Sequence, residues 1–152
     1  QWPVNVHIDT LEIQREGPSY TVDSLRELRR TLGEQASLVW IIGADQLTNL
    51  HTWHEWRELF ALTNLCIAAR PGYEINQAAL DSEVVHEISR RIANPSQLKQ
   101  TACGLCFIAY HLAWEVSSTA LRESLQHGEP VKGLLPTRVL DYAQQHHLYQ
   151  TT

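Results

Sequence analysis

The sequence predicts an α/β fold built on a parallel sheet. Three apolar runs of strand length, at 38–42, 65–69 and 105–110, lack polar alternation, which is typical of strands covered on both faces. Segments with helical periodicity separate these runs, and strand–helix–strand units with short connections form parallel sheets. A length of 152 residues predicts one domain over 1–152.

The remaining elements follow from periodicity and from turn residues. The segment 4–13 alternates apolar and polar residues with one phase shift, which predicts a half-buried strand with a bulge. One apolar stripe predicts a helix from Thr21 to Leu32, with Gly33 as its end. Further helices are predicted at 53–62, at 76–93 with Asn94-Pro95 closing it, at 117–126 with Gly128 closing it, and from Pro136 at the first helical position to about His147.

Composition limits the classes of function. Hydrophobic residues make up 43% of the chain and charged residues 19%, as in globular proteins. The net charge of −5 argues against a nucleic-acid track, which needs a basic face. No apolar run approaches the length of a membrane span, and three cysteines form no disulfide framework. We therefore expect a cytoplasmic protein without nucleic-acid or membrane partners.

The stretch 38–56 is the centre of the predicted fold. Gly43 allows close approach of the backbone to a ligand, and Asp45 adds acceptors just beyond the strand's carboxyl end, where open α/β sheets bind substrates. As an alternative, Asp45 caps the following turn. Thr52 and Glu55 match a capping box, which predicts Thr52 as an N-cap and Trp53 in the first helical turn.

Tryptophans in this stretch have two interpretations. Burial in the core is the ordinary role of a lone tryptophan. Trp56, Leu59 and Phe60 fit the inner face of the predicted helix and are assigned to the core. Trp53 lies beside a loop, which is a poor place to bury a large ring, and we assign it to the ligand crevice.

A run of hydroxyl residues forms a second candidate site. Ser117, Ser118 and Thr119 stand at a predicted helix start, where free N–H groups and the helix dipole favour an anion, and Arg122 lies one turn further along. The alternative is an ordinary serine N-cap with a surface arginine. Cys103 and Cys106 form a CxxC without further ligands at suitable spacing, so a packed strand cysteine is favoured over metal or redox chemistry.

These motifs together carry a resemblance to a known family. The chain resembles the bacterial nicotinate mononucleotide adenylyltransferases, and G-P-S-Y-T with I-G-A-D and T-W is the most specific part of the match. The resemblance implies a Rossmann-like nucleotidyltransferase fold and an enzyme of NAD biosynthesis. The matching segments are 17–26, 41–45, Thr52-Trp53, 70–73, 116–122, 134–136 and 147–149.

The resemblance also implies roles for individual residues. Trp53 would stack on the pyridine ring, while the backbone at His54 and the Thr21 hydroxyl would hold the nicotinate carboxylate. On the ATP side, Gly43 and Asp45 would lie against the ribose, Arg70 near the adenine, and Ser117, Ser118, Thr119 and Arg122 at the phosphates. The implied reaction joins nicotinate mononucleotide to the adenylyl group of Mg²⁺-bound ATP, giving deamido-NAD and pyrophosphate.

The start of the chain departs from the family pattern. No methionine is present and the chain opens at Gln1, so we expect it to be the downstream part of a longer protein. The family's H-x-G-H motif and its first two strands have no counterpart. We therefore assign no catalytic residue in this chain, expect it to be inactive alone, and expect copies to associate through the open edge of strand 38–42. Two alternatives are another nucleotidyltransferase, such as a pantetheine-phosphate one, and a non-catalytic nucleotide-binding fragment.

Overall fold

A computed structural model describes residues 6–71, 75–110, 117–131 and 133–149. Val4, Gly72, Tyr73 and Val116, which were used in the sequence analysis, lie outside these ranges. The chain divides into two compact units, 1–112 and 113–152, and each is described by itself. One domain over 152 residues stays a prediction.

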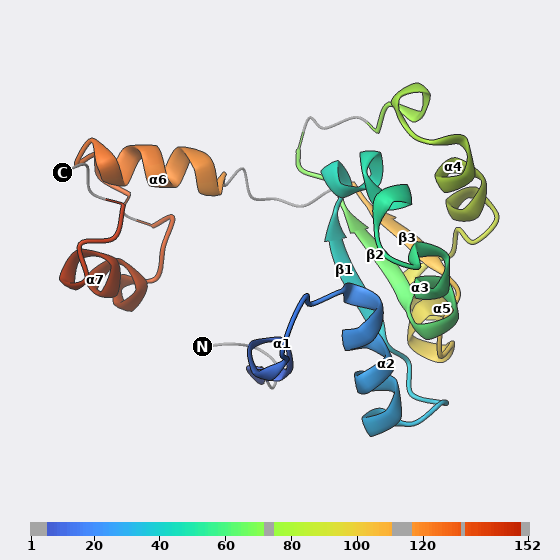
Figure 1. Cartoon of the computed structure of the whole chain (residues 1–152). Coiled ribbons are helices and arrows are strands. Elements are labelled where there is room, and N and C mark those ends of the chain that lie inside the picture. The colour runs from blue at the N-terminus through green and yellow to red at the C-terminus, as the bar shows by residue number, and fades with distance from the viewer. Residues whose placement is uncertain (1–5, 72–74, 111–116, 132, 150–152) are drawn as a thin grey trace. The chain divides into compact units, whose positions relative to one another are not determined.

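The first unit contains a three-stranded parallel sheet. Its strands are β1 (Val39–Gly43), β2 (Asn64–Ala68) and β3 (Cys106–Ala109), in the order β1-β2-β3. Ile41 is the register partner of Cys66, and Ile67 that of Ile108. Figure 1 shows the strands side by side. The three predicted strands and their parallel arrangement are confirmed.

Helices and 3₁₀ turns connect the strands (Figure 1). Helix α2 spans Thr21–Leu32 as predicted, and Gly33 ends it with a φ of 86°, a conformation that glycine adopts readily. The other elements of this unit are α1 (Leu11–Gln14), η1 (Ala44–Thr48), η2 (Leu50–Thr52), η3 (Trp56–Glu58), α3 (Leu59–Leu62), η4 (Gln77–Ala79), α4 (Ser82–Ser89) and α5 (Pro95–Gln100). None of the helices in the described ranges is long and apolar enough to cross a membrane.

The predicted strand at 4–13 is wrong for its described part. Residues 6–10 form no strand, and Leu11–Gln14 is a helical turn. Its backbone donors are satisfied locally, because Asp9 Oδ1 accepts from the Leu11 N–H at 2.9 Å and the Thr10 carbonyl accepts from Ile13. Ile8 and Ile13 are exposed, so local hydrogen bonding decides this segment rather than apolar alternation.

The predicted burial of the first strand on both faces is also wrong. Ile42 is buried, but the side chain of Ile41 is 69% exposed. Within the described residues, β1 pairs with β2 alone and is an edge strand. Successive side chains of a strand point to opposite faces of the sheet, so at β1 the face that carries Ile42 is covered and the face that carries Val39 and Ile41 is not.

The helix predicted over 76–93 is interrupted. Residues 77–79 form the turn η4, and α4 begins only at Ser82 because Asp81 accepts a hydrogen bond from the Glu83 N–H at 2.8 Å. Asn94 does not close a helix but is the N-cap of α5. Its side-chain oxygen accepts a hydrogen bond from the Gln97 N–H, and the Asn94 N–H donates to the side-chain oxygen of Gln97. This capping box, with Pro95 at the first helical position, was a readable signal that the sequence analysis missed.

One hydrophobic core joins α2, the sheet and α4. Val22, Leu25, Leu65, Ile67 and Val84 are fully buried members of it. Trp56, Leu59 and Phe60 also belong to it, which confirms their predicted place.

The second unit contains two helices, α6 (Ser118–Gln126) and α7 (Thr137–Gln145). Pro136 precedes the first residue of α7 rather than occupying it, so the predicted start is wrong by one position. The helix ends before the predicted His147, which has a left-handed φ of 52° and cannot continue it.

Candidate functional site

A small cavity lies at the carboxyl ends of β1 and β2. It has a volume of about 130 Å³ and is lined by Ala44, Asp45, Ala68 and Arg70. Asp45 and Arg70 are both exposed and come from two neighbouring strand ends. Parallel strands bring their carboxyl ends to one edge of the sheet, and the structure places these two predicted site residues together there.

Gly43 leaves room for the Asp45 carboxylate. A Cβ atom at position 43 would lie 2.4 Å from Asp45 Oδ1, closer than nonbonded atoms approach. Asp45 Oδ2 accepts a hydrogen bond from Gln46 Nε2 at 3.0 Å. The residue before η1 is Gly43, and the turn has no side-chain cap, so the structure does not support the alternative in which Asp45 caps it.

The path of residues 49–58 differs from the prediction. Thr52 ends the turn η2 and its hydroxyl donates to the Asn49 carbonyl at 2.7 Å, so it is not an N-cap. Trp53 is extended (φ −69°, ψ 143°) rather than in a first helical turn, and the α-helical part begins only at Leu59. The predicted capping box is therefore wrong, because the Glu55 side chain binds Arg26 of α2 instead.

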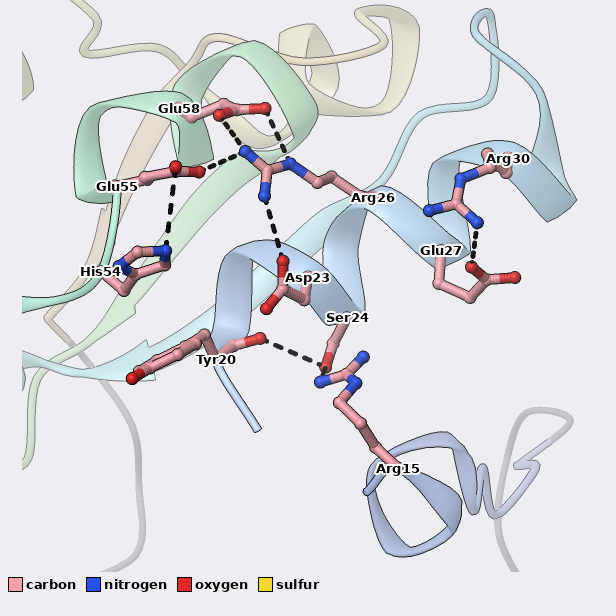
Figure 2. A network of polar contacts seen from close by, with 10 residues as sticks. All are labelled: Arg15, Tyr20, Asp23, Ser24, Arg26, Glu27, Arg30, His54, Glu55 and Glu58. Carbon is pink, nitrogen blue, oxygen red and sulfur yellow. Dashed lines mark hydrogen bonds and ion pairs between the residues drawn. The ribbon is translucent and has the colours of Figure 1, made fainter. Parts of the chain in front are cut away.

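The residues assigned to the pyridine ring come from two adjacent segments. Thr21 is the first residue of α2, and the preceding Tyr20 places its ring 4.4 Å from the His54 ring, centroid to centroid. Figure 2 shows these two rings facing each other. Trp53 is half-buried and packs against the core. The start of α2 and the Trp53-His54 pair thus lie side by side.

Arg26 joins these same two segments through carboxylates (Figure 2). Its Nε donates to Glu58 Oε1 at 3.0 Å, its Nη1 donates to Asp23 Oδ1 at 3.0 Å, and its Nη2 contacts both Glu55 and Glu58. The hydrogen bonds from Arg26 hold the pKa of the Glu58 carboxyl below its usual value, and the carboxylates raise the pKa of Arg26. Sequence reasoning missed this cluster, because Glu55 and Glu58 lie 29 and 32 residues from Arg26 in the chain.

The hydroxyl run begins α6 in the second unit. Ser117 is the N-cap, and its hydroxyl accepts from the Ala120 N–H at 3.4 Å. Ser118 and Thr119 are the first helical residues and are exposed, as is Arg122, whose guanidinium lies 5.8 Å from the Tyr149 ring centroid. The serine N-cap is therefore present, and three exposed polar side chains remain beside it.

The two cysteines of the CxxC differ in position, because Cys106 is the first residue of β3 and Cys103 lies half-buried in the bend before it. Cys106 is fully buried in β3, and burial raises the pKa of its thiol to about 12. Burial also raises the pKa of Cys66. The described part of the chain holds no cluster of three or more histidines, cysteines or carboxylates suited to a metal ion.

Comparison with known proteins defines the class first. The family model described as Cytidylyltransferase-like matches residues 2–124. The parallel sheet with flanking helices fits that class, so the fold is that of a cytidylyltransferase-like nucleotidyltransferase.

Individual relatives narrow the class. A probable nicotinate-nucleotide adenylyltransferase of Herminiimonas arsenicoxydans is 45% identical over 97% of this chain and 68% of the relative. Another from Dechloromonas aromatica is 40% identical over 95% of this chain and 67% of the relative. The chain belongs to the nicotinate-nucleotide adenylyltransferase family, which confirms the resemblance inferred from the motifs, and it spans about two thirds of the length of these relatives.

A solved structure agrees in fold. The nicotinic acid mononucleotide adenylyltransferase of Plasmodium falciparum, in a structure described as complexed with NaAD, superposes with a TM-score of 0.57 over 87% of this chain and 58% of that one. The sequence identity is 14%, so this likeness concerns the fold alone.

Proposed function

We propose that the protein carrying this chain transfers the adenylyl group of ATP to nicotinate mononucleotide, forming deamido-NAD and pyrophosphate. The observation that supports this best is the cavity between Asp45 and Arg70, at the sheet edge where this class of fold takes its nucleotide. Family membership supports the choice of pyridine substrate.

In the proposed reaction a phosphate oxygen of nicotinate mononucleotide attacks the α-phosphorus of ATP. The new P–O bond forms as the bond to the β-phosphate oxygen breaks, and pyrophosphate leaves with those electrons. When bound to ATP, Mg²⁺ would offset the negative charge of the phosphates. No enzyme nucleophile is required, so the chain's contribution is to position the substrates and to stabilise charge.

At the nucleotide end, we assign Gly43 and Asp45 to the ribose and Arg70 to the adenine. The Asp45 carboxylate is an exposed acceptor that suits ribose hydroxyls. The phosphates are assigned to the start of α6, where Ser117, Ser118, Thr119 and Arg122 offer hydroxyls, N–H groups and one cation.

At the pyridine end, we assign Trp53 to stacking on the ring. The backbone of His54 and the Thr21 hydroxyl are assigned to the carboxylate of nicotinate. The proximity of the start of α2 to residues 53–54, through the rings of Tyr20 and His54, supports this grouping.

Two broader parts of the proposal concern location and assembly. The three cysteines are free thiols, which supports the reducing cytosol as the compartment of the protein.

We also propose that copies of this chain associate through β1, whose described edge opposite β2 is unpaired and whose Ile41 is exposed. Light scattering should then give a mass above that of one chain, and a monomeric mass would contradict this part.

Pyrophosphate release by the complete gene product tests the reaction. Nicotinate mononucleotide should be a far better acceptor than phosphopantetheine, and Trp53→Ala should raise its KM roughly two- to tenfold through lost stacking. Trp56→Ala serves as the contrast, because Trp56 is a core residue and its loss should lower stability instead. If Trp53→Ala leaves this KM unchanged, the pyridine ring does not stack on Trp53.

A further inference from the structure

We propose that Arg26 is a positioning residue for the pyridine end of the site. It holds the Trp53-His54 segment on the first half of α2 by binding Glu55 and Glu58. This inference rests on the proposed function, since the substrate it concerns is nicotinate mononucleotide.

The contacts of Arg26 link α2 to the segment that follows Trp53. Arg26 Nε donates to Glu58 Oε1 at 3.0 Å, and Nη2 contacts both Glu55 and Glu58. A guanidinium binds carboxylates as a planar fork with directed donors, so it constrains orientation as well as distance. Figure 2 shows the two glutamates converging on this one group from above α2.

The backbone of Glu55 makes this link consequential. Glu55 has a left-handed conformation, φ 50° and ψ 37°, which a residue with a Cβ rarely adopts. Such a conformation persists where surrounding contacts hold it, and the side chain of Glu55 is held by Arg26. The turn connects Trp53-His54 to Trp56, which is buried in the core, so its geometry sets where Trp53 lies.

A second contact joins residue His54 to the N-terminal end of α2. Tyr20 packs its ring on that of His54, with centroids 4.4 Å apart, and Thr21 follows Tyr20 directly. The residues proposed to hold nicotinate thus lie between two tethers to one helix. Loss of Arg26 removes the contact that carries charge and direction, and leaves the aromatic contact and the packing of Trp53 against the core.

The same helix offers a matched control. Arg30 pairs with Glu27 three residues earlier, within α2, and its side chain is 72% exposed. That ion pair links no second segment. Arg30→Ala therefore removes an arginine and an ion pair from α2 without touching residues 53–58.

The decisive experiment compares Arg26→Ala, Glu58→Gln and Arg30→Ala in the complete gene product. We expect Arg26→Ala to raise KM for nicotinate mononucleotide about tenfold, because small displacements of a positioned group are costly. The KM for ATP and kcat should stay within about threefold. The melting temperature should stay within about 4 °C, because the Arg26 side chain is 32% exposed and ion pairs that water reaches contribute little to stability. Glu58→Gln should act in the same direction, so the result does not depend on one variant, and Arg30→Ala should match the wild type.

Two further measurements separate positioning from direct binding. Amide hydrogen exchange over 51–57 should accelerate in Arg26→Ala and not in Arg30→Ala, without any substrate present. The double variant Arg26→Ala/Glu58→Gln should be no worse than Arg26→Ala, because both changes break one link. Additive losses would mean that Arg26 and Glu58 act independently rather than through one link. Either that result or a wild-type KM with unchanged exchange would overturn the inference. If the wild type makes no deamido-NAD, the proposed function fails; the exchange result still reports on the tether.

Discussion

The two ends of the sheet use polar side chains differently. At the amino end, the buried side chain of Asn64 forms hydrogen bonds with backbone groups, whereas at the carboxyl end Asp45 and Arg70 lie exposed around a cavity. Asn64 Nδ2 donates to the Thr101 carbonyl at 2.7 Å and to the Leu98 carbonyl at 3.3 Å, and Oδ1 accepts from Leu105 N at 2.9 Å. Nearby, Arg29 donates to five more carbonyls, those of Gly33, Glu34, Ala36, Leu62 and Ala102.

This difference distinguishes polar side chains that stabilise the fold from polar side chains that are available to a ligand. No buried side-chain polar atom in the described residues lacks a hydrogen-bond partner, and the polar atoms of Asn64 use their hydrogen-bonding capacity within the protein. Exposed polar groups around a cavity keep that capacity. Substitutions at the amino end should therefore lower stability, and those at the carboxyl end should lower affinity at constant stability.

The largest expected effect is that of Asn64→Ala. It removes the hydrogen-bond partner of the Leu105 N–H and of the Thr101 carbonyl, while the Leu98 carbonyl keeps the Ser37 hydroxyl as a donor. The loss should lower the free energy of unfolding by about 3–5 kcal/mol. Urea denaturation measures it. Asn76→Ala is the control, because Asn76 caps only the exposed turn η4 and its loss should cost about 1 kcal/mol or less. Equal effects at both positions would break the comparison.

Arg29→Ala should cost less, about 2–3 kcal/mol, because charged hydrogen bonds to the backbone are lost while water reaches part of the site. Arg30→Ala, next in sequence and exposed, should change stability by about 0.5 kcal/mol or less. The pair tests whether contacts with carbonyls, rather than helix charge, explain the role of Arg29. Similar melting curves for the two variants would contradict that role.

Cys106, at the amino end of β3, should make stability pH-dependent. Burial raises the pKa of its thiol from an ordinary 9.0 to about 12, so above pH 9 the unfolded chain releases this proton while the folded chain keeps it. The contribution is complete below pH 9 and is lost as pH rises toward 12, by about 1 kcal/mol at pH 10. Unfolding measured at pH 8 and pH 10 should show this loss, and Cys106→Ala should reduce it. If Cys106→Ala loses as much stability between pH 8 and pH 10 as the wild type, the pH dependence comes from other groups.

The smallest change in free energy is expected for a substitution of Asp45, at the carboxyl end of the sheet. Asp45→Asn keeps the shape of the side chain but weakens an acceptor for ribose hydroxyls, and should raise KM for ATP about fivefold, or about 1 kcal/mol. The free energy of unfolding should stay within about 0.5 kcal/mol of the wild type, because Asp45 is exposed. A loss of stability without a loss of affinity would place Asp45 with the structural residues of the other end.

Local sequence patterns by themselves determined α2, its end at Gly33 and the three strands. In these segments apolar periodicity and a glycine terminator agree with the final packing, so no distant contact was needed to predict them. The meeting of Asp45 and Arg70 was also predictable, because parallel strands bring their carboxyl ends to one edge.

Only the tertiary structure decided the path of residues 52–58 and the exposure of β1. Thr52 and Glu55 have the local pattern of a capping box, but Glu55 binds Arg26, which lies 29 residues earlier in the chain and is invisible to local spacing. The apolar run of β1 predicts burial on both faces, yet Ile41 is exposed, because burial depends on which segments pack against the strand. Periodicity describes a segment alone, whereas an ion pair or a covered face also requires its partner.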